Sequence, residues 1–281
     1  MPEVFHFKGK KAGAHLLVLG AVHGNETAGP KAIQRLIPDL QAGRVVLTQG
    51  ELTLIPVCNL KAYQQDVRQI DENLNRVMKW HDQPTTYEQT LANDLVPYLQ
   101  ECDVLLDLHS SHCPGDIPFA FCDYPTPDNQ KLVQALPVEY VLQGWPTIYR
   151  NNPTIQDFST EWLAHEYGKS ASTLECGYHK APEAAEVAYQ AILEVLSAFG
   201  SIEGEVHKHP QQHILMQNYV IKEAPGRLAK PYKHLDPVTK GQPLAIYEDG
   251  RILTAPEDGY ILLPNPAGEI GAEWYYFGVP A

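Results

Sequence analysis

Roughly the first 200 residues of this 281-residue chain alternate short apolar runs with longer amphipathic stretches. In the stretch 183–199, for example, apolar residues from Val187 to Val195 recur with the period of a helix. Alternation of this kind predicts an α/β fold, a mixed sheet flanked by helices. We expect strands at 15–20, 51–57, 103–108, 117–122 and 171–175, and helices at 27–41, 86–100, 156–167 and 183–199.

The pattern changes after Gly200. From about residue 210, short alternating runs are separated by turn dipeptides such as Asp249-Gly250 and Asp258-Gly259. An Asp-Gly pair between two strand-like runs is typical of a β-hairpin. We therefore expect two domains, an α/β domain over residues 1–205 and a smaller all-β sandwich or barrel over residues 206–281.

Charge and cysteine content limit the class of protein. The formal net charge is −13 and no basic run opposes it, so nucleic-acid binding is not expected. No apolar stretch approaches the ~20 residues that span a bilayer, and the N-terminus lacks the features of a signal peptide. The five cysteines lack the spacing of a disulfide framework. These features predict a cytoplasmic protein with reduced thiols, and they leave the oligomeric state open, a homo-oligomer included.

Three potential metal ligands follow two of the apolar runs. His23 and Glu26 come just after the run Leu16–Leu19, and His109 ends the run that starts at Val104. The carboxyl ends of strands in such a sheet are where functional residues gather. Two imidazoles and one carboxylate leave a tetrahedral zinc ion with one open position, which is typical of a catalytic zinc. The alternative is that Asn25 or Thr27 caps the following helix and His23 is an ordinary loop residue.

Two further residues near His109 compete for a role. His112 could replace His109 as a ligand, but Cys113-Pro114-Gly115 indicates a loop there, so we favour His109. Asp107 points to the same side of a strand as His109. It either orients a ligand imidazole or is a structural hydrogen-bond acceptor.

Glu175 ends the apolar strand-like run that precedes Gly177. A carboxylate beside zinc can take a proton from water and pass it to the leaving amine, so Glu175 is the candidate general base. Its alternative is a surface ion pair.

The segment 67–76 is rich in groups that bind anions. Arg76 beside Asn75 is suited to a substrate carboxylate, because a guanidinium forms paired hydrogen bonds with it. Arg68 could stabilise an oxyanion. The alternative is a loop with several solvated charges.

Four of these segments together resemble the succinylglutamate desuccinylase/aspartoacylase family of zinc-carboxypeptidase-like hydrolases. They are Gly20–Glu26, Asn73–Arg76, Asp107–His109 and Leu174–Gly177, in the family's order, and the β-rich C-terminal part resembles the family's second domain. The resemblance implies one Zn²⁺ per chain on His23, Glu26 and His109, with Glu175 as general base and acid. It further implies that Arg68 polarises the scissile carbonyl while Asn75 and Arg76 bind a substrate carboxylate.

The family resemblance also implies a reaction, the hydrolysis of the amide bond in a small, anionic N-acyl amino acid such as N-succinylglutamate or N-acetylaspartate. It implies that the C-terminal domain covers the active site and supplies a tyrosine to it, for which Tyr275 is the nearest match and Tyr276 the alternative. Aspartoacylases carry an additional arginine about ten residues before the base, but the stretch 161–166 contains none, which puts aspartate specificity in doubt.

Two other functions compete with the deacylase. A zinc carboxypeptidase acting on peptides would use the same metal, arginine and glutamate, and would need an open groove rather than a covered site. A metal-binding scaffold without catalysis would leave Glu175 and Arg68 dispensable.

Overall fold

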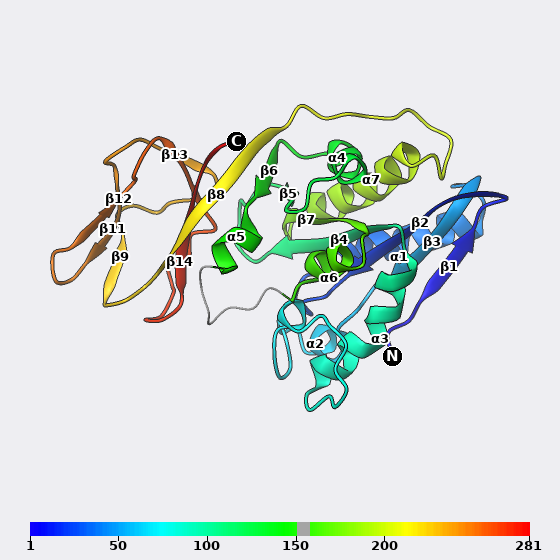
Figure 1. Cartoon of the computed structure of the whole chain (residues 1–281), viewed down its shortest axis with the longest axis horizontal. Helices are drawn as coiled ribbons and strands as arrows, with labels where there is room; N and C mark the ends of the chain where they lie inside the picture. The colour runs from blue at the N-terminus through cyan, green and yellow to red at the C-terminus, as the bar shows by residue number, and fades with distance from the viewer. Residues whose placement is uncertain (151–157) are drawn as a thin grey trace. The chain divides into compact units, whose positions relative to one another are not determined.

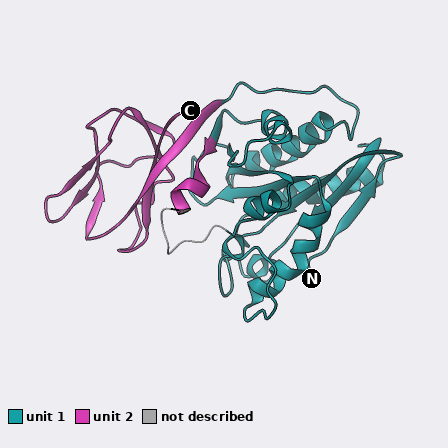
Figure 2. Ribbon diagram, viewed as in Figure 1, with its two compact units in different colours: residues 1–141, 156–211 teal, residues 142–155, 212–281 magenta. Residues whose placement is uncertain are grey.

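The structure, a computed structural model, describes residues 1–150 and 158–281 (Figure 1). The chain forms two compact units (Figure 2). The first contains Met1–Val141 and Gln156–Gln211, and the second contains Leu142–Ile155 and Gln212–Ala281. The second unit thus includes a segment well before residue 206, where we placed the start of the C-terminal domain.

The first unit is built on a mixed sheet with strand order β1-β3-β2-β4-β7-β5. The central strands β3, β2, β4 and β7 run parallel to one another, whereas β1 and β5 run antiparallel to their neighbours. The strands are β1 (Phe5–Lys8), β2 (Lys11–Gly20), β3 (Gln49–Ile55), β4 (Val104–Ser111), β5 (Phe119–Phe121) and β7 (Ser170–Tyr178). The five predicted strands and the α/β class are confirmed. Strand β1, which the sequence analysis did not predict, pairs along β3.

Helices cover both faces of this sheet because side chains alternate between the faces along each strand. Leu16 and Val18 of β2 pack into one core, together with α1 (Ala28–Gln41) and α7 (Pro182–Ala198). The intervening residues Leu17 and Leu19 pack into a second core on the other face. The remaining helices of this unit are α2 (Leu60–Gln64), α3 (Tyr87–Glu101), α4 (Pro127–Gln134) and α6 (Thr160–Glu166), with a 3-10 turn η1 (Leu74–Arg76).

Polar caps fix the starts of two helices on this second face. The hydroxyl of Thr86 accepts a hydrogen bond from the backbone N–H of Gln89 at the start of α3, and Ser159 caps α6 in the same way. The predicted helix 156–167 corresponds to α6, and its first two residues lie outside the described part of the chain. The predictions of α1, α3 and α7 are each correct to within two residues.

The second unit is mainly antiparallel β structure. One set of strands has the order β8-β14-β13-β10, and a smaller sheet has the order β12-β11-β9. Their bounds are β8 (Gln212–Ile221), β9 (Gly226–Leu228), β10 (Asp236–Val238), β11 (Pro243–Tyr247), β12 (Ile252–Thr254), β13 (Gly259–Leu262) and β14 (Glu273–Pro280). Trp274 and Phe277 are central to its core. Helix α5 (Trp145–Arg150) also belongs to this unit, and β6 (Tyr140–Gln143) lies at the boundary along the chain.

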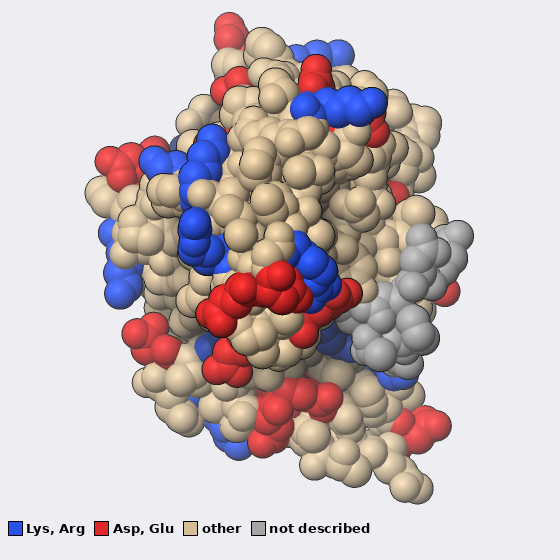
Figure 3. Space-filling model, turned by 90° about the vertical axis from the view of Figure 1, so that its left-hand side faces the viewer, with Lys and Arg blue, Asp and Glu red and all other residues tan. Residues whose placement is uncertain are grey.

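Two features bear on the class of partner. None of the helices within residues 1–150 and 158–281 has both the length and the apolar character needed to cross a bilayer. On the face drawn in Figure 3, outside the grey atoms, Lys and Arg side chains lie in separate small groups among Asp and Glu. That face therefore offers no continuous basic surface for nucleic acid.

Candidate metal centre and catalytic site

The parallel strands bring His23, Glu26 and His109 to one edge of the first unit's sheet. Strands β2 and β4 are adjacent, and the residues that follow β2 lie beside the carboxyl end of β4. Each of the three residues offers one ligand atom, and these atoms lie within 4.8 Å of one another. All three side chains are buried. The cluster predicted from the sequence is therefore present in the fold.

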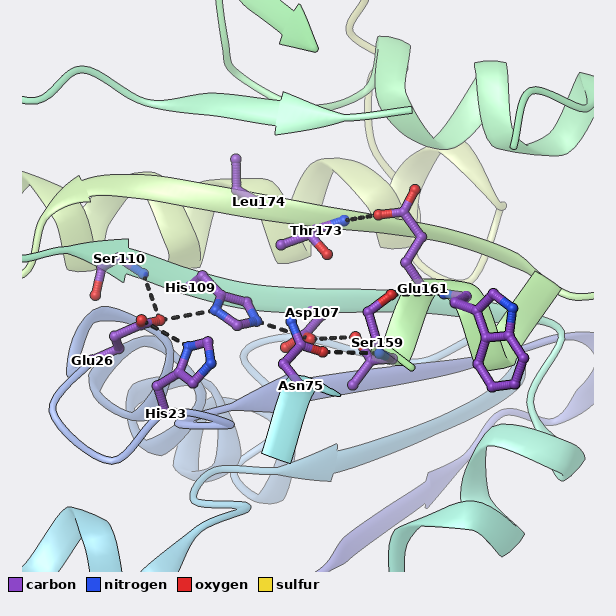
Figure 4. A network of polar contacts seen from close by, with 12 residues as sticks. His23, Glu26, Asn75, Asp107, His109, Ser110, Ser159, Glu161, Thr173 and Leu174 are labelled. Carbon is purple, nitrogen blue, oxygen red and sulfur yellow. Dashed lines mark hydrogen bonds and ion pairs between the residues drawn. The ribbon is translucent and has the colours of Figure 1, made fainter. Parts of the chain in front are cut away.

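The carboxylate of Glu26 lies between the two imidazoles (Figure 4). Its Oε1 is 2.9 Å from Nδ1 of His23, and its Oε2 is 2.9 Å from Nδ1 of His109. The backbone N–H of Ser110 also donates to Oε2 at 3.2 Å. Both histidines thus present the same ring nitrogen toward a common point.

The outer nitrogen of each imidazole has its own acceptor. Nε2 of His23 donates to Oδ1 of Asn73 at 2.9 Å, and Nε2 of His109 donates to Oδ2 of Asp107 at 3.0 Å. An N–H held in this way leaves Nδ1 with a lone pair, which is how proteins orient histidines for a metal. The donor set of two imidazole nitrogens and one carboxylate oxygen fits a divalent transition metal such as zinc.

Asp107 takes both of the roles that the sequence left open. Its carboxylate is completely buried, accepts the hydrogen bond from His109 and also accepts one from the hydroxyl of Thr160 at 2.5 Å. It therefore orients the imidazole and connects β4 to the start of α6. His112, in contrast, is exposed in the loop after β4 and is not part of the ligand cluster.

The turn that carries His23 and Glu26 has an unusual backbone. Ala21 adopts a left-handed φ of 46°, which is rare and strained for a residue with a side chain. A Cβ on Gly24 would lie 2.2 Å from the carbonyl carbon of Ala62 in α2, so only glycine fits there. The hydroxyl of Thr27 does not cap α1 but donates to the carbonyl of His179. The helix-cap alternative therefore does not describe this segment.

Burial and charge act against each other in this cluster. Burial lowers the pKa of His23 to about 4, with Glu26 opposing that shift. Burial alone would raise the pKa of Glu26, but the two imidazoles outweigh it and hold that pKa well below its usual value. For His109, the carboxylates of Asp107 and Glu26 outweigh burial and raise its pKa. Without a metal ion, an ionised Glu26 thus pairs with a His109 that favours its protonated form, and a bound metal would take the place of that proton on Nδ1.

Glu175 lies next to this cluster on β7. It is the direct neighbour of His109 in the strand register and is partly exposed, unlike the three buried residues of the cluster. Burial, followed by the negative charge of Glu26, raises its pKa to about 7, although His109 and Arg68 oppose the shift. A carboxyl group with a pKa near neutrality can both accept and donate a proton at physiological pH.

A single buried carboxylate holds the segment that carries the predicted substrate-binding residues. Glu88 of α3 accepts hydrogen bonds from the backbone N–H groups of Ile70, Asp71 and Glu72 at 2.8 Å, 3.1 Å and 3.3 Å. It also accepts one from the side chain of Asn59 at 3.1 Å. The segment 67–76 contains no strand, so no strand pairing holds its backbone, and these hydrogen bonds to Glu88 fix its conformation next to the metal cluster.

Arg68, Asn75 and Arg76 have different surroundings within this segment. The guanidinium of Arg68 donates to Oε1 of Glu26 at 2.9 Å, while about half of its side chain (48%) is exposed. Asn75 is buried and accepts a hydrogen bond from the backbone of Thr160 through Oδ1. Nη1 of Arg76 donates to the carbonyl of Asn75 at 2.7 Å. The structure thus connects Arg68 directly to the ligand cluster.

Tyr275 belongs to the second unit and lies on β14, where its ring packs in that unit's core. Burial raises its pKa. Tyr276 is also buried, and its hydroxyl is 3.4 Å from that of Tyr149. The substrate-binding role of Tyr275 stays a prediction.

Sequence reasoning missed several residues that support this site. They are Asn73, which contacts His23; Thr160, which donates to Asp107; Glu88, which holds the segment 70–72; and His179, whose carbonyl accepts a hydrogen bond from Thr27 next to Glu26. Asn73 could have been predicted, because it belongs to the Asn73–Arg76 segment and an amide oxygen is a common hydrogen-bond partner of a ligand histidine. The others depend on contacts between distant parts of the chain.

Solved structures with the same fold come from several bacteria. A succinylglutamate desuccinylase/aspartoacylase from Rhodobacter sphaeroides has a TM-score of 0.80 at 20% identity, covering 99% of this chain and 89% of that one. A succinylglutamate desuccinylase from Silicibacter sp. has a TM-score of 0.79 at 23% identity, and the match covers 100% of this chain and 89% of that one. The product-bound structure of the ectoine utilization protein EutE from Ruegeria pomeroyi has a TM-score of 0.78 at 22% identity, and the match covers 98% of this chain and 88% of that one. No curated protein matches the chain.

A match to a sequence family covers most of the first unit. Residues 12–198 match the family described as the succinylglutamate desuccinylase/aspartoacylase catalytic domain. This range includes the ligand cluster, the segment held by Glu88 and the candidate base Glu175. The family consists of deacylase hydrolases. With two thirds of its length inside that match, the chain belongs to the succinylglutamate desuccinylase/aspartoacylase family.

Proposed function

We propose that this protein is a zinc-dependent amidohydrolase that splits a small N-acyl amino acid into a carboxylic acid and a free amino acid. The observation that supports this most is the shared orientation of His23 and His109, whose Nδ1 atoms face Glu26 while their outer nitrogens are held by Asn73 and Asp107. A zinc ion held by these ligands would polarise the scissile carbonyl and make water more acidic.

Glu175 is the proton carrier in this proposal. It removes a proton from the attacking water and delivers it to the nitrogen of the leaving amino acid. Its position beside His109 in the strand register and its pKa of about 7 both support this role. Burial is the largest cause of the shift, and the negative charge of Glu26 adds to it.

The segment 67–76 supplies the groups that bind the substrate. Arg68, with a half-exposed guanidinium beside the ligand cluster, is placed to stabilise negative charge that develops on the carbonyl oxygen. Arg76 and Asn75 bind the carboxylate of the substrate, since a guanidinium keeps its charge at any physiological pH. A small anionic substrate follows from these charges.

The stretch 161–166 bears on which amino acid is bound. It lies within α6 and contains no arginine. Its buried acidic residue, Glu161, accepts hydrogen bonds from the backbone of Asp123 and of Thr173. Glu161 thus has a structural role, and this stretch offers no arginine for the second carboxylate of an aspartate. We therefore do not assign N-acetylaspartate as the substrate.

The test is a substrate screen with a matched pair of variants. Zinc-loaded protein is assayed against N-acetyl and N-succinyl amino acids and against short peptides with a free carboxyl terminus. Deacylation that Glu175→Gln abolishes and the exposed control Glu183→Gln retains would support the proposal. Hydrolysis of peptides alone would favour the carboxypeptidase, and full activity in Glu175→Gln would overturn the mechanism.

Metal analysis tests the zinc site independently of activity. His109→Ala removes one of three ligands and leaves the buried Asp107 without its partner. We expect this variant to lose zinc after dialysis under conditions in which the unmodified protein retains it. Undiminished zinc content would remove His109 from the site.

A further inference from the structure

A second cluster of metal-binding side chains lies on three strands of the first unit, away from the carboxyl ends that carry the candidate active site. His6 of β1, His15 of β2 and Glu51 of β3 each offer one ligand atom, and these atoms lie within 4.8 Å of one another. The mechanism proposed above uses none of them.

Strand register places the three side chains on one face of the sheet. His15 is the direct partner of Glu51 across the parallel β2–β3 pair, and His6 is the partner of Thr53 across the antiparallel β1–β3 pair. Glu51 and Thr53 are two residues apart on one strand, so their side chains point the same way. The juxtaposition therefore follows from the pairing of the strands and does not depend on a surface loop.

Hydrogen bonds to one threonine orient both imidazoles. The hydroxyl of Thr53 is 3.1 Å from Nδ1 of His6 and 2.8 Å from Nε2 of His15. A hydroxyl oxygen has two lone pairs and can accept an N–H from each ring. In that arrangement the second nitrogen of each imidazole keeps its lone pair, and Nε2 of His6 lies 3.3 Å from Oε2 of Glu51. Thr53 is buried, so its hydroxyl is fixed beneath the cluster.

The surroundings leave room for an ion and favour a cation. The cluster lines a cavity of about 710 Å³ whose wall also includes Glu101 and Asp103. The ammonium of Lys8 contacts Oε1 of Glu51, at 2.5 Å. The other oxygen of Glu51, Oε2, faces His6.

We propose that His6, His15 and Glu51 form a second site for a divalent transition-metal ion, which binds β1 to β2 and β3 at the amino ends of the parallel strands. Two imidazoles and a carboxylate suit zinc and the neighbouring first-row ions, whereas calcium and magnesium prefer oxygen ligands alone. Because the three ligands come from three strands, a bound ion stabilises the pairing of the edge strand β1.

The experiment counts zinc ions in variants in which each site is removed separately. Protein stripped with a chelator is dialysed against micromolar free zinc, and bound metal is measured by mass spectrometry. We expect two ions per chain in the unmodified protein, one in His23→Gln/His109→Gln, and none when His6→Gln/His15→Gln is added to that pair. The exposed residue His207 provides the control, since His207→Gln removes an imidazole outside both clusters.

A second measurement identifies the ligands and keeps folding defects apart from loss of the site. In the His23→Gln/His109→Gln background, cobalt should give the absorption bands of a coordinated ion, and zinc should raise the unfolding temperature. Both effects should disappear with His6→Gln/His15→Gln, while the circular dichroism of the chelated protein stays unchanged. Absence of bound zinc in the His23→Gln/His109→Gln protein, or equal binding after His6→Gln/His15→Gln, would overturn the proposal. Both of these outcomes are observed in protein that already lacks His23 and His109, so neither of them tests the proposed catalytic zinc site.

Discussion

Replacing Glu88 by glutamine tests how the segment beside the metal cluster is held. The carboxylate of Glu88 is fully buried and accepts hydrogen bonds from four donors, two on each oxygen. Glutamine has almost the same shape but replaces one oxygen with an amide NH₂ group, which is a donor. Whichever way the amide turns, two of the four donors then lack an acceptor.

The magnitude follows from those two donors. Each buried donor without a partner costs ~1–3 kcal/mol, which gives about 2–6 kcal/mol for the pair. A neutral amide is easier to bury than a carboxylate, and this offsets part of the loss. We therefore expect the free energy of unfolding to fall by about 2–3 kcal/mol, a loss that a domain with ~5–15 kcal/mol of stability can tolerate.

Urea unfolding followed by circular dichroism measures this loss, with Asp94→Asn as the control on the same helix. The carboxylate of Asp94 lies 3.8 Å from the N-terminal amine, near the surface. A surface substitution changes stability by about 0.5 kcal/mol or less. If Glu88→Gln and Asp94→Asn have the same midpoint and slope, then Glu88 does not hold the segment and the reasoning fails.

Three further predictions concern the candidate site. Asp107→Asn keeps an acceptor for His109 but removes the negative charge of the carboxylate, so zinc affinity should fall by roughly 10–100-fold in a chelator competition. An unchanged affinity would contradict the orienting role of Asp107. In metal-free protein, the raised pKa of Glu175 means that the folded state favours its protonated form. The stability of the folded state is therefore lost as the pH rises from 4.5, the pKa of the unfolded chain, to about 7. Above pH 7, Glu175→Gln should be more stable than the parent by up to about 3 kcal/mol, and at pH values below 4.5 the two proteins should be equally stable. Gly24→Ala places a Cβ 2.2 Å from the backbone of Ala62 and should lower the free energy of unfolding by about 1–3 kcal/mol and weaken zinc binding, whereas parent-like urea curves would show that the turn can move.

The ligand cluster could be predicted because its signal is local. His23 follows one apolar run, His109 ends another, and parallel strands bring their carboxyl ends to the same edge of a sheet. The position of Glu175 beside the cluster was predictable for the same reason, while its catalytic role stays a prediction. Each step needed only a strand pattern and a polar residue at its end.

Glu88 and the segment 142–150 show which features cannot be predicted from local sequence patterns. A glutamate within an amphipathic helix is normally a solvated residue, and this one is buried because the backbone N–H groups of residues 70–72 and the side chain of Asn59 donate to it. Similarly, residues 142–150 show no change of composition, yet they belong to the second unit. Both features arise from tertiary contacts, which no local pattern encodes.

The strand order has a consequence for the time course of folding. Strands β2 and β4 are neighbours in the sheet, but α1, β3, α2 and α3 lie between them in the chain, and Glu26 contacts Ser110 across 84 residues. Contacts of such high sequence separation form slowly because closing the intervening chain costs entropy before they provide any stabilisation. The ligand set is thus incomplete while the helices are already forming. In a refolding experiment, uptake of metal should lag behind the helical signal and report the moment at which β2 docks beside β4.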